Sequence, residues 1–479
     1  MSSWSVAGWL ALAIYSFALT ALVFRHLGPP VFGLWAVITS IRGLLLLLDG
    51  GLALGVTRDV VLSGNDASAR QRVASAYWLY LVIGATVMVL GLAAIQLPAL
   101  LLHLSGSSAN VSSAVTAIVV VDAAVALAAS PVSATLRGRG RFDIIAASSI
   151  VQSVVGLLAA WLLIDRLGLT GVAMATLASR VIAGSFSLGF LSLSGFKPWR
   201  SPVAIHALKA VMRFATPLYV LTIASQLAIG TDVPIVGSFY GAVPAAAYGV
   251  GAAVPATAAV LLFTILDVAF PSLSGAEEGD YARLMRWMLV VGTALGALGF
   301  TTLALNSKAL LQVWLGNAPN LAVVVMVIYS VTRLLNVPGH ILAIGAIAKG
   351  QHNVLAPVVI LEALANVGLS IFLAATYSPI GPAVATLVML FVSNIIVLPL
   401  VLRRRLQISL RAAGFQVLLG SSGGLAVSLI VWLISSHLPG PVNQLIGAFI
   451  GTLLAALVMI VAGPRLRYAP IRLLTVIRF

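Results

Sequence analysis

The sequence predicts an all-α polytopic membrane protein with 14 transmembrane helices. Of its 479 residues, 61% are hydrophobic and only 8% are charged, whereas a soluble domain carries about 25% charged residues. The apolar residues form long runs, and each run can cross a bilayer core of about 30 Å. The gaps between the runs are short, so none of them could fold as a separate domain.

The first six spans make up a predicted N-terminal lobe, residues 1–196. The N-terminal run has no basic leader and no small-residue cleavage site, so it is read as a membrane helix and not as a signal peptide. The second run is apolar throughout except for one arginine and a few acidic or basic residues near its inner end. The six predicted spans are residues 4–25, 31–59, 73–97, 112–136, 144–164 and 169–193.

Eight further spans follow the longest inner gap, which contains the predicted cytoplasmic linker 197–212. Six of them form a predicted C-terminal lobe, residues 213–403, and the last two lie with a basic tail in residues 404–479. Residues 27–38 recur loosely at 240–251, which indicates two repeated halves, as in many secondary transporters. The eight predicted spans are residues 213–238, 245–271, 285–306, 321–346, 353–376, 380–402, 413–436 and 441–463.

The basic residues predict the orientation of these spans. Of the 27 lysines and arginines, 21 fall in gaps or helix ends on the side of the N-terminus, and three fall on the opposite side. Basic residues concentrate on the cytoplasmic side of membrane proteins. Both termini are therefore expected in the cytoplasm, and the chain is expected in a bacterial plasma (inner) membrane.

The remaining three basic residues, Arg42, Arg180 and Arg333, lie inside predicted spans. Each is 11 or 12 residues from the outer end of its span, which places all three near the middle of the bilayer. A charge at that depth costs at least about 3 kcal/mol. Because guanidinium stays charged and binds phosphate or carboxylate in a bidentate manner, the shared depth indicates a cationic cavity for an anionic head group.

Two polar stripes accompany these arginines. Trp35, Arg42 and Asp49 recur every seven residues on one helix face. On the tenth span, Tyr329, Arg333 and Asn336 share a face with His340. The aromatic side chains could stack on sugars, although aromatic residues are ordinary packing in most helices.

Internal charge pairing is the alternative to a substrate cavity. Asp49, Asp122 and Glu362 could neutralise the three arginines, and such pairs can be structural. Asp232 and Glu362 are also candidates for proton or sodium coupling, because burial favours a protonated carboxyl group. A hydrogen-bonded helix bend beside Pro234 or Pro357 is the plainer explanation for these two positions.

Missing motifs narrow the class. The sequence has no phosphate-binding loop of the G-x-x-x-x-G-K-[ST] type, no cysteine, no histidine–glutamate metal motif and no assembled catalytic triad. The chain is therefore not expected to be an enzyme or to use a cofactor other than H⁺ or Na⁺. The net charge of +15 is spread over helix ends and not gathered for nucleic acid.

The stretch from residue 27 to residue 61 resembles the start of the Wzx-type polysaccharide transporters, which belong to the multidrug/oligosaccharidyl-lipid/polysaccharide (MOP) exporter superfamily with the MATE-like exporters. The pattern "LG…-G-aromatic-…-DxG-…-R" is carried by Leu27, Gly28, Gly33, Trp35, Asp49, Gly51 and Arg58. The resemblance implies two six-helix lobes in a V shape, plus helices 13 and 14.

The resemblance also implies a function. An undecaprenyl-diphosphate-linked oligosaccharide, such as an O-antigen or another surface-polysaccharide repeat unit, would be flipped from the inner to the outer leaflet by alternating access. Partners would be this polyprenyl-diphosphate-linked glycan, membrane lipids and a glycan polymerase or assembly proteins. Two alternatives remain open: a lipid II-type peptidoglycan precursor flippase and a cation-coupled multidrug exporter.

Overall fold

Two compact units make up the chain, Met1–Ala246 and Ala247–Phe479. A computed structural model describes residues 3–49, 52–62, 67–194, 226–227, 230–406 and 409–462. The predicted linker 197–212 lies outside these residues. The boundary between the units falls after it, because α8 (Asp232–Tyr240) packs on α1 and α4 of the first unit. The predicted V shape concerns the relative placement of the lobes and stays a prediction.

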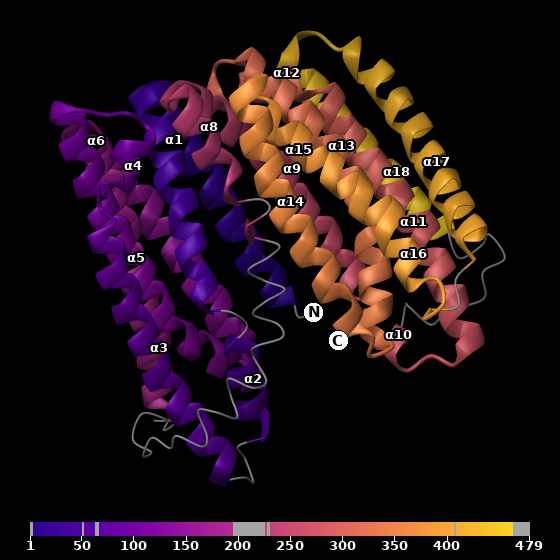
Figure 1. Ribbon diagram of the computed structural model, residues 1–479, viewed down its shortest axis with the longest axis horizontal. Helices are drawn as coiled ribbons and strands as arrows, with labels where there is room; N and C mark the ends of the chain where they lie inside the picture. The colour runs from indigo at the N-terminus through magenta and orange to yellow at the C-terminus, as the bar shows by residue number, and fades with distance from the viewer. Residues whose placement is uncertain are drawn as a thin grey trace. The chain divides into compact units, whose positions relative to one another are not determined.

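Unit 1 is a bundle of long helices, in which α5 packs against α3 and α6 while α1 packs against α6 (Figure 1). Its core lies among α2, α3 and α5 and includes Val56, Tyr80 and Leu136. Besides α8, its elements are α1 (Ser3–Leu45), η1 (Leu46–Asp49), α2 (Leu52–Leu62), α3 (Ala67–Ala93), α4 (Leu97–Leu101), α5 (Gly106–Gly138) and α6 (Phe142–Leu193).

Helices α1 and α6 each consist of two helices joined at a glycine. Gly28 has φ 79° and ψ 169°, and Gly168 has φ 56° and ψ −136°. Glycine adopts such conformations readily because it has no Cβ atom. At about 1.5 Å per residue, α6 would otherwise be about 78 Å long, far more than a bilayer core. Each glycine therefore divides two of the predicted spans.

The predicted span 31–59 is not one helix, and this part of the sequence prediction was wrong. The α-helix ends at Leu45, Leu46–Asp49 form a 3-10 turn, and α2 begins at Leu52. Gly50 and Gly51 follow the turn in the sequence. Each glycine costs about 1 kcal/mol relative to alanine inside a helix, so the sequence directly after this turn favours a helix less than the apolar run before it.

Unit 2 contains a bundle in which α11 packs against α13 and α17 (Figure 1). The core includes Met285, Met288 and Ile341. Its elements are α9 (Ala242–Asp267, which starts in unit 1), α10 (Phe270–Ser274), α11 (Glu278–Leu305), α12 (Ser307–Leu315), α13 (Asn320–Ala348), η3 (His352–Val354), α14 (Leu355–Thr376), α15 (Gly381–Phe391), η4 (Val392–Val397), α16 (Leu398–Leu402), α17 (Leu410–Ser436) and α18 (Gly440–Ala462).

Eleven segments of the described chain are long and apolar enough to cross a membrane. Two of these segments contain a helix break at a glycine: Gly28 divides Trp4–Leu62, and Gly168 divides Phe142–Leu193. The predicted span 213–238 lies mostly outside the described residues. An all-α polytopic membrane protein is thus confirmed, and the count of 14 stays a prediction.

Corresponding glycines support the internal repeat suggested by the sequence. Gly241 lies between α8 and α9 with φ 84° and ψ −173°, nearly the conformation of Gly28 between the first two helices. Gly140 and Gly350 have φ values of 71° and 69° and end α5 and α13 in the same way. The same backbone break therefore recurs at matching places in the two halves of the chain.

Candidate functional site

An arginine–aspartate–arginine cluster lies in the middle of unit 1. The Nε atom of Arg42 donates to Oδ2 of Asp122 at 2.6 Å, and the Nε atom of Arg180 donates to Oδ1 of the same carboxylate. The Asp122 side chain is 2% exposed, whereas the two arginine side chains are 19% and 20% exposed. One carboxylate thus bridges two guanidinium groups, and the cluster keeps a net charge of one positive unit.

The packing of three helices produces this cluster. Asp122 lies midway along α5, about 24 Å from either helix end at a rise of about 1.5 Å per residue. Both α1 and α6 pack against α5, and each contributes one arginine. Because both arginines reach the same carboxylate, they lie at one level, deep between the ends of these helices.

A polar cavity of about 250 Å³ adjoins Arg180 in unit 1. It extends between α5 and α6 to Arg137, an exposed residue at the end of α5 that the basic-residue bias assigns to the cytoplasmic side. Its polar lining consists of Arg137 and Arg180 with Ser130, Ser133, Ser148, Gln152 and Ser187. A hydrated anionic group would find hydrogen-bond donors from both helices, beside alanine, valine and glycine residues of the same wall.

Asp49 belongs to a separate polar contact in the same unit. Its carboxylate accepts hydrogen bonds from the buried Tyr80 hydroxyl and, at 3.4 Å, from the Ser130 hydroxyl. The helix break places Asp49 in a 3-10 turn, so the predicted stripe from Trp35 through Arg42 does not continue to it as one helix face. Trp35 is buried at 8% exposure, and its backbone carbonyl accepts a hydrogen bond from the Thr39 hydroxyl.

Unit 2 has its own buried arginine. Arg333 is 4% exposed, and its guanidinium carbon lies 5.7 Å from the centre of the Tyr329 ring. The Tyr329 hydroxyl is 3.2 Å from the Tyr248 hydroxyl. Two members of the predicted stripe are therefore together in one buried cluster. A ring of all three arginines would join both units and stays a prediction.

A polar contact beside a π-helical turn holds another predicted residue. Asn394 lies in the turn η4 and donates to the side-chain oxygen of Asn336 at 3.2 Å. A Cβ atom at Gly339 would come within 1.9 Å of the Asn394 oxygen. The close approach of α13 to η4 therefore depends on this glycine.

The two coupling candidates are placed differently. Asp232 is fully buried in the first turn of α8, in unit 1. Glu362 is half-buried on α14 and has a side-chain hydrogen bond with Ser393. Among the described residues, no group of three or more histidine, aspartate or glutamate side chains could hold a metal ion.

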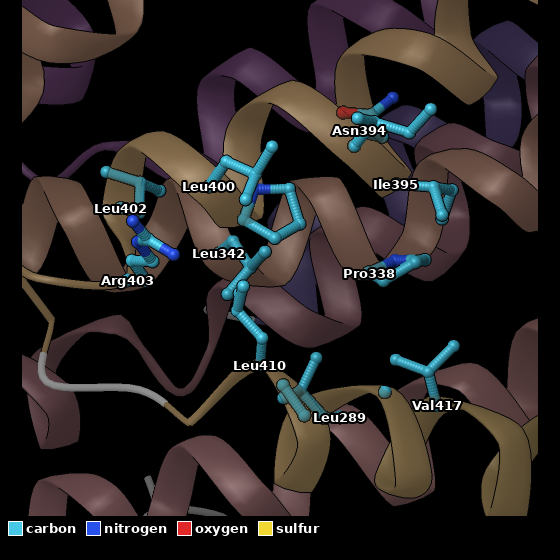
Figure 2. Close-up of a pocket in the computed structure, with 14 residues that line it drawn as sticks. Leu289, Pro338, Leu342, Asn394, Ile395, Leu400, Leu402, Arg403, Leu410 and Val417 are labelled. Atoms are coloured by element: carbon cyan, nitrogen blue, oxygen red, sulfur yellow. The ribbon is translucent and has the colours of Figure 1, made fainter.

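The apolar pocket of unit 2 has a different character. Its volume is about 310 Å³, and leucine, isoleucine, valine and proline side chains from α11, α13, α16, α17 and η4 form most of its wall. Figure 2 shows Asn394 and Arg403 as the polar members of this wall. A sugar or phosphate group would lose its hydrogen bonds there, so the polar cavity of unit 1 is the better candidate for a head group.

Several residues that form these contacts or line the cavity were not predicted from the sequence. Tyr80, Ser130, Gln152, Tyr248 and Asn394 are uncharged, so they gave no signal comparable to a charge in an apolar run. A search for polar residues facing Asp49 and Asp122 at helical spacing along residues 112–136 could have found Ser130.

Comparisons with known proteins agree with this architecture. A family model described as "Polysaccharide biosynthesis protein" matches residues 2–277, more than half of the chain. No curated protein sequence matches significantly.

Several solved structures share the fold. A lipid II flippase, MurJ, in an inward closed conformation has a TM-score of 0.73 at 13% identity, with 96% of this chain and 98% of that chain covered. An inward-facing multidrug resistance MATE family transporter has 0.65 at 17% identity, with 87% and 95% covered. A MOP superfamily transporter from Pyrococcus furiosus has 0.59 at 15% identity, with 88% and 94% covered.

At 13–17% identity these structures establish only the fold. The family model matches the amino-acid sequence over residues 2–277, so it establishes the family. Both agree with an all-α membrane protein built from long helices. The chain therefore belongs to the polysaccharide biosynthesis protein family, and it is a multi-pass membrane protein with the fold of these MATE and MurJ structures.

Proposed function

We propose that this transporter flips a polyprenyl-diphosphate-linked oligosaccharide from the inner to the outer leaflet of the bacterial plasma membrane. The family implies a lipid-linked glycan as substrate. The observation that carries the finer proposal is the positive cluster of Arg42 and Arg180 around one carboxylate, beside a polar cavity in the membrane.

The charge of the cluster suits a diphosphate. Moving an ion from water into a medium of low dielectric costs on the order of 20 kcal/mol before compensation, so a diphosphate needs fixed counter-charges on its path. Arg42 and Arg180 supply two positive groups, of which Asp122 leaves one net positive charge in the cluster, and guanidinium binds phosphate through paired N–H donors. The lipid tail stays in the bilayer, while the head group passes the polar wall as the lobes alternate between inward and outward states.

Export of cationic drugs is the rival function within the superfamily. A cavity for cations should carry net negative charge or open aromatic faces, whereas this cluster is net positive and Trp35 is buried. A lipid II-type flippase remains the closer alternative, because any diphosphate would suit two arginines. Flipping assays with both glycan types decide between them.

Several finer features belong to the same proposal. Asp232 or Glu362 would couple transport to H⁺ or Na⁺, and Arg333 with Tyr329 and Asn336 would contact the head group from the second lobe. Both termini would lie in the cytoplasm. Membrane lipids and a glycan polymerase or assembly proteins would be the partners.

The test is a flipping assay in proteoliposomes with a fluorescent polyprenyl-diphosphate oligosaccharide, scored by its accessibility to a membrane-impermeant quencher. Arg42→Ala and Arg180→Ala should each lower the rate about 10- to 150-fold, since a hydrogen bond to a charged group contributes about 1.5–3 kcal/mol. Asp122 keeps one arginine partner in either variant, so the fold should persist.

Arg72→Ala is the matched control. Arg72 is also an ion-paired arginine of unit 1, and its Nε atom lies 2.9 Å from the Asp59 carboxylate. It lies at the predicted cytoplasmic end of α3, so its replacement should leave the flipping rate nearly unchanged. Wild-type rates in both membrane-centre variants, with normal insertion, would rule out the proposed role of the cluster.

A further inference from the structure

The bridging position between Arg42 and Arg180 is already occupied by an anion of the protein itself. Each Asp122 carboxylate oxygen takes one arginine Nε–H group. Arginine has five N–H donors, and within the described part of the chain no other hydrogen bond from these two guanidinium groups is found. The two arginines therefore have further N–H groups that can donate hydrogen bonds, but the position between them is occupied by the Asp122 carboxylate.

Exposure distinguishes the carboxylate from its partners. The Asp122 side chain is almost completely buried, whereas about a fifth of each arginine side chain is exposed. Arg180 also lines the polar cavity. An anion in this cavity thus meets Arg180 before it meets Asp122, which does not line the cavity.

We propose that Asp122 is an internal competitor for the substrate's diphosphate. Its carboxylate holds Arg42 and Arg180 together in the empty transporter, and the diphosphate replaces it there. The inference rests on the proposed function, because it assigns a role to Asp122 at that site. Two anions of like charge in one low-dielectric site repel each other strongly, so the diphosphate and the carboxylate cannot both bridge the arginines.

Displacement requires a rearrangement of the Asp122 side chain, such as a change of its χ1 rotamer, because its backbone lies in the middle of α5. When the carboxylate returns, it lowers the affinity for the diphosphate and favours release. In the empty state it also offsets part of the positive charge inside the membrane.

The test measures binding of inorganic pyrophosphate to the purified full-length protein by calorimetry at constant ionic strength. Asp122→Asn keeps the size of the side chain but removes the competing charge. A competitor that occupies nine-tenths of the molecules weakens the apparent affinity about tenfold, so the Kd for pyrophosphate should fall by about tenfold or more. If Asp122 only positions the arginines, the Kd should rise or stay unchanged, and either result overturns the proposal.

Asp49→Asn is the matched control. It also removes a carboxylate from unit 1, but the hydrogen bonds found for Asp49 among the described residues come from Tyr80 and Ser130 and not from an arginine. The affinity for pyrophosphate should not change. An equal gain in affinity in both variants would mean that overall charge, and not competition, determines binding.

Asp122→Asn places two arginines beside each other without a carboxylate between them, and this repulsion could prevent folding. In that case a second pair of variants tests the proposal. Arg180→Gln leaves the single pair of Arg42 and Asp122, and the double variant Arg180→Gln with Asp122→Asn leaves Arg42 alone. The double variant should bind pyrophosphate more tightly than Arg180→Gln, and equal affinities overturn the proposal.

The outcomes also separate this inference from the proposed function. If wild-type protein binds pyrophosphate through Arg42 and Arg180 but Asp122→Asn does not strengthen binding, only the competitor role fails. If neither arginine affects pyrophosphate binding or flipping, the cluster is not the diphosphate site and both proposals fail.

Discussion

Helix α17 approaches α11 so closely that two of its glycines leave no room for a side chain. A Cβ atom at Gly424 would lie 2.2 Å from the carbonyl oxygen of Ala294, and one at Gly420 would lie 2.3 Å from that of Val290. A backbone oxygen cannot move aside as a flexible side chain can, so Gly424→Ala must separate the two helices. Overpacking of this kind costs about 1–3 kcal/mol.

The neighbouring Gly423 provides a matched control in the same helix turn. A Cβ atom at Gly423 meets nothing within 4 Å, and alanine is favoured over glycine inside a helix by about 0.5–1 kcal/mol. Both variants gain this helix propensity, so their free energies of unfolding should differ by the overpacking cost of about 1–3 kcal/mol, with Gly424→Ala the less stable variant and Gly423→Ala at least as stable as wild type.

The assay is thermal unfolding of both variants and the wild type in one detergent. Because unfolding of such proteins is often irreversible, one scan rate must be used and the apparent Tm compared. Equal Tm values for the two variants, or a lower value for Gly423→Ala, would refute the inference that α17 docks on α11 through these glycines.

Three further predictions concern unit 2. Arg333→Ala should abolish flipping in the proteoliposome assay, and Arg333→Lys should restore it only in part, because lysine lacks the planar fork of guanidinium; full activity in Arg333→Ala would exclude a head-group contact. Glu362→Gln should remove any dependence of the flipping rate on a proton or sodium gradient, and an unchanged dependence would exclude Glu362 as the coupling group. Gly339→Ala should displace Asn394 and lower the apparent Tm, since a buried amide left unsatisfied costs about 1–3 kcal/mol. Gly368→Ala, where a Cβ atom meets nothing, is its control, and equal Tm values would contradict the prediction.

The charged residues of the cluster could be identified from the sequence, but their pairing could not. A charge in an apolar run is visible in a single sequence, so Arg42, Asp122 and Arg180 stand out from the pattern of residues alone. Pairing was one of two open explanations, and Asp122 was one of three possible carboxylate partners. Which partner bridges which arginine depends on how α1, α5 and α6 pack, and the periodicity of one helix carries no information on that.

Helix breaks were harder to predict than helices. The run 31–59 is apolar enough to be read as one span, yet Leu46–Asp49 within it form a 3-10 turn and not an α-helix. The π-helical turn Val392–Val397 likewise lies inside an uninterrupted apolar run. Hydropathy reports the solvent that a segment prefers and not the hydrogen-bond register of its backbone.

The sequence by itself determined the class of this protein. Its apolar runs require a membrane because water cannot solvate them, and the motif around Gly28 and Asp49 pointed to the family that the comparisons confirm. The basic residues predict an orientation. The tertiary structure decided what the buried charges do. Only packing of distant helices brings Arg42 and Arg180 onto one carboxylate, because the free energy of a charge inside a membrane depends on the partners within a few ångströms and not on its neighbours in the chain.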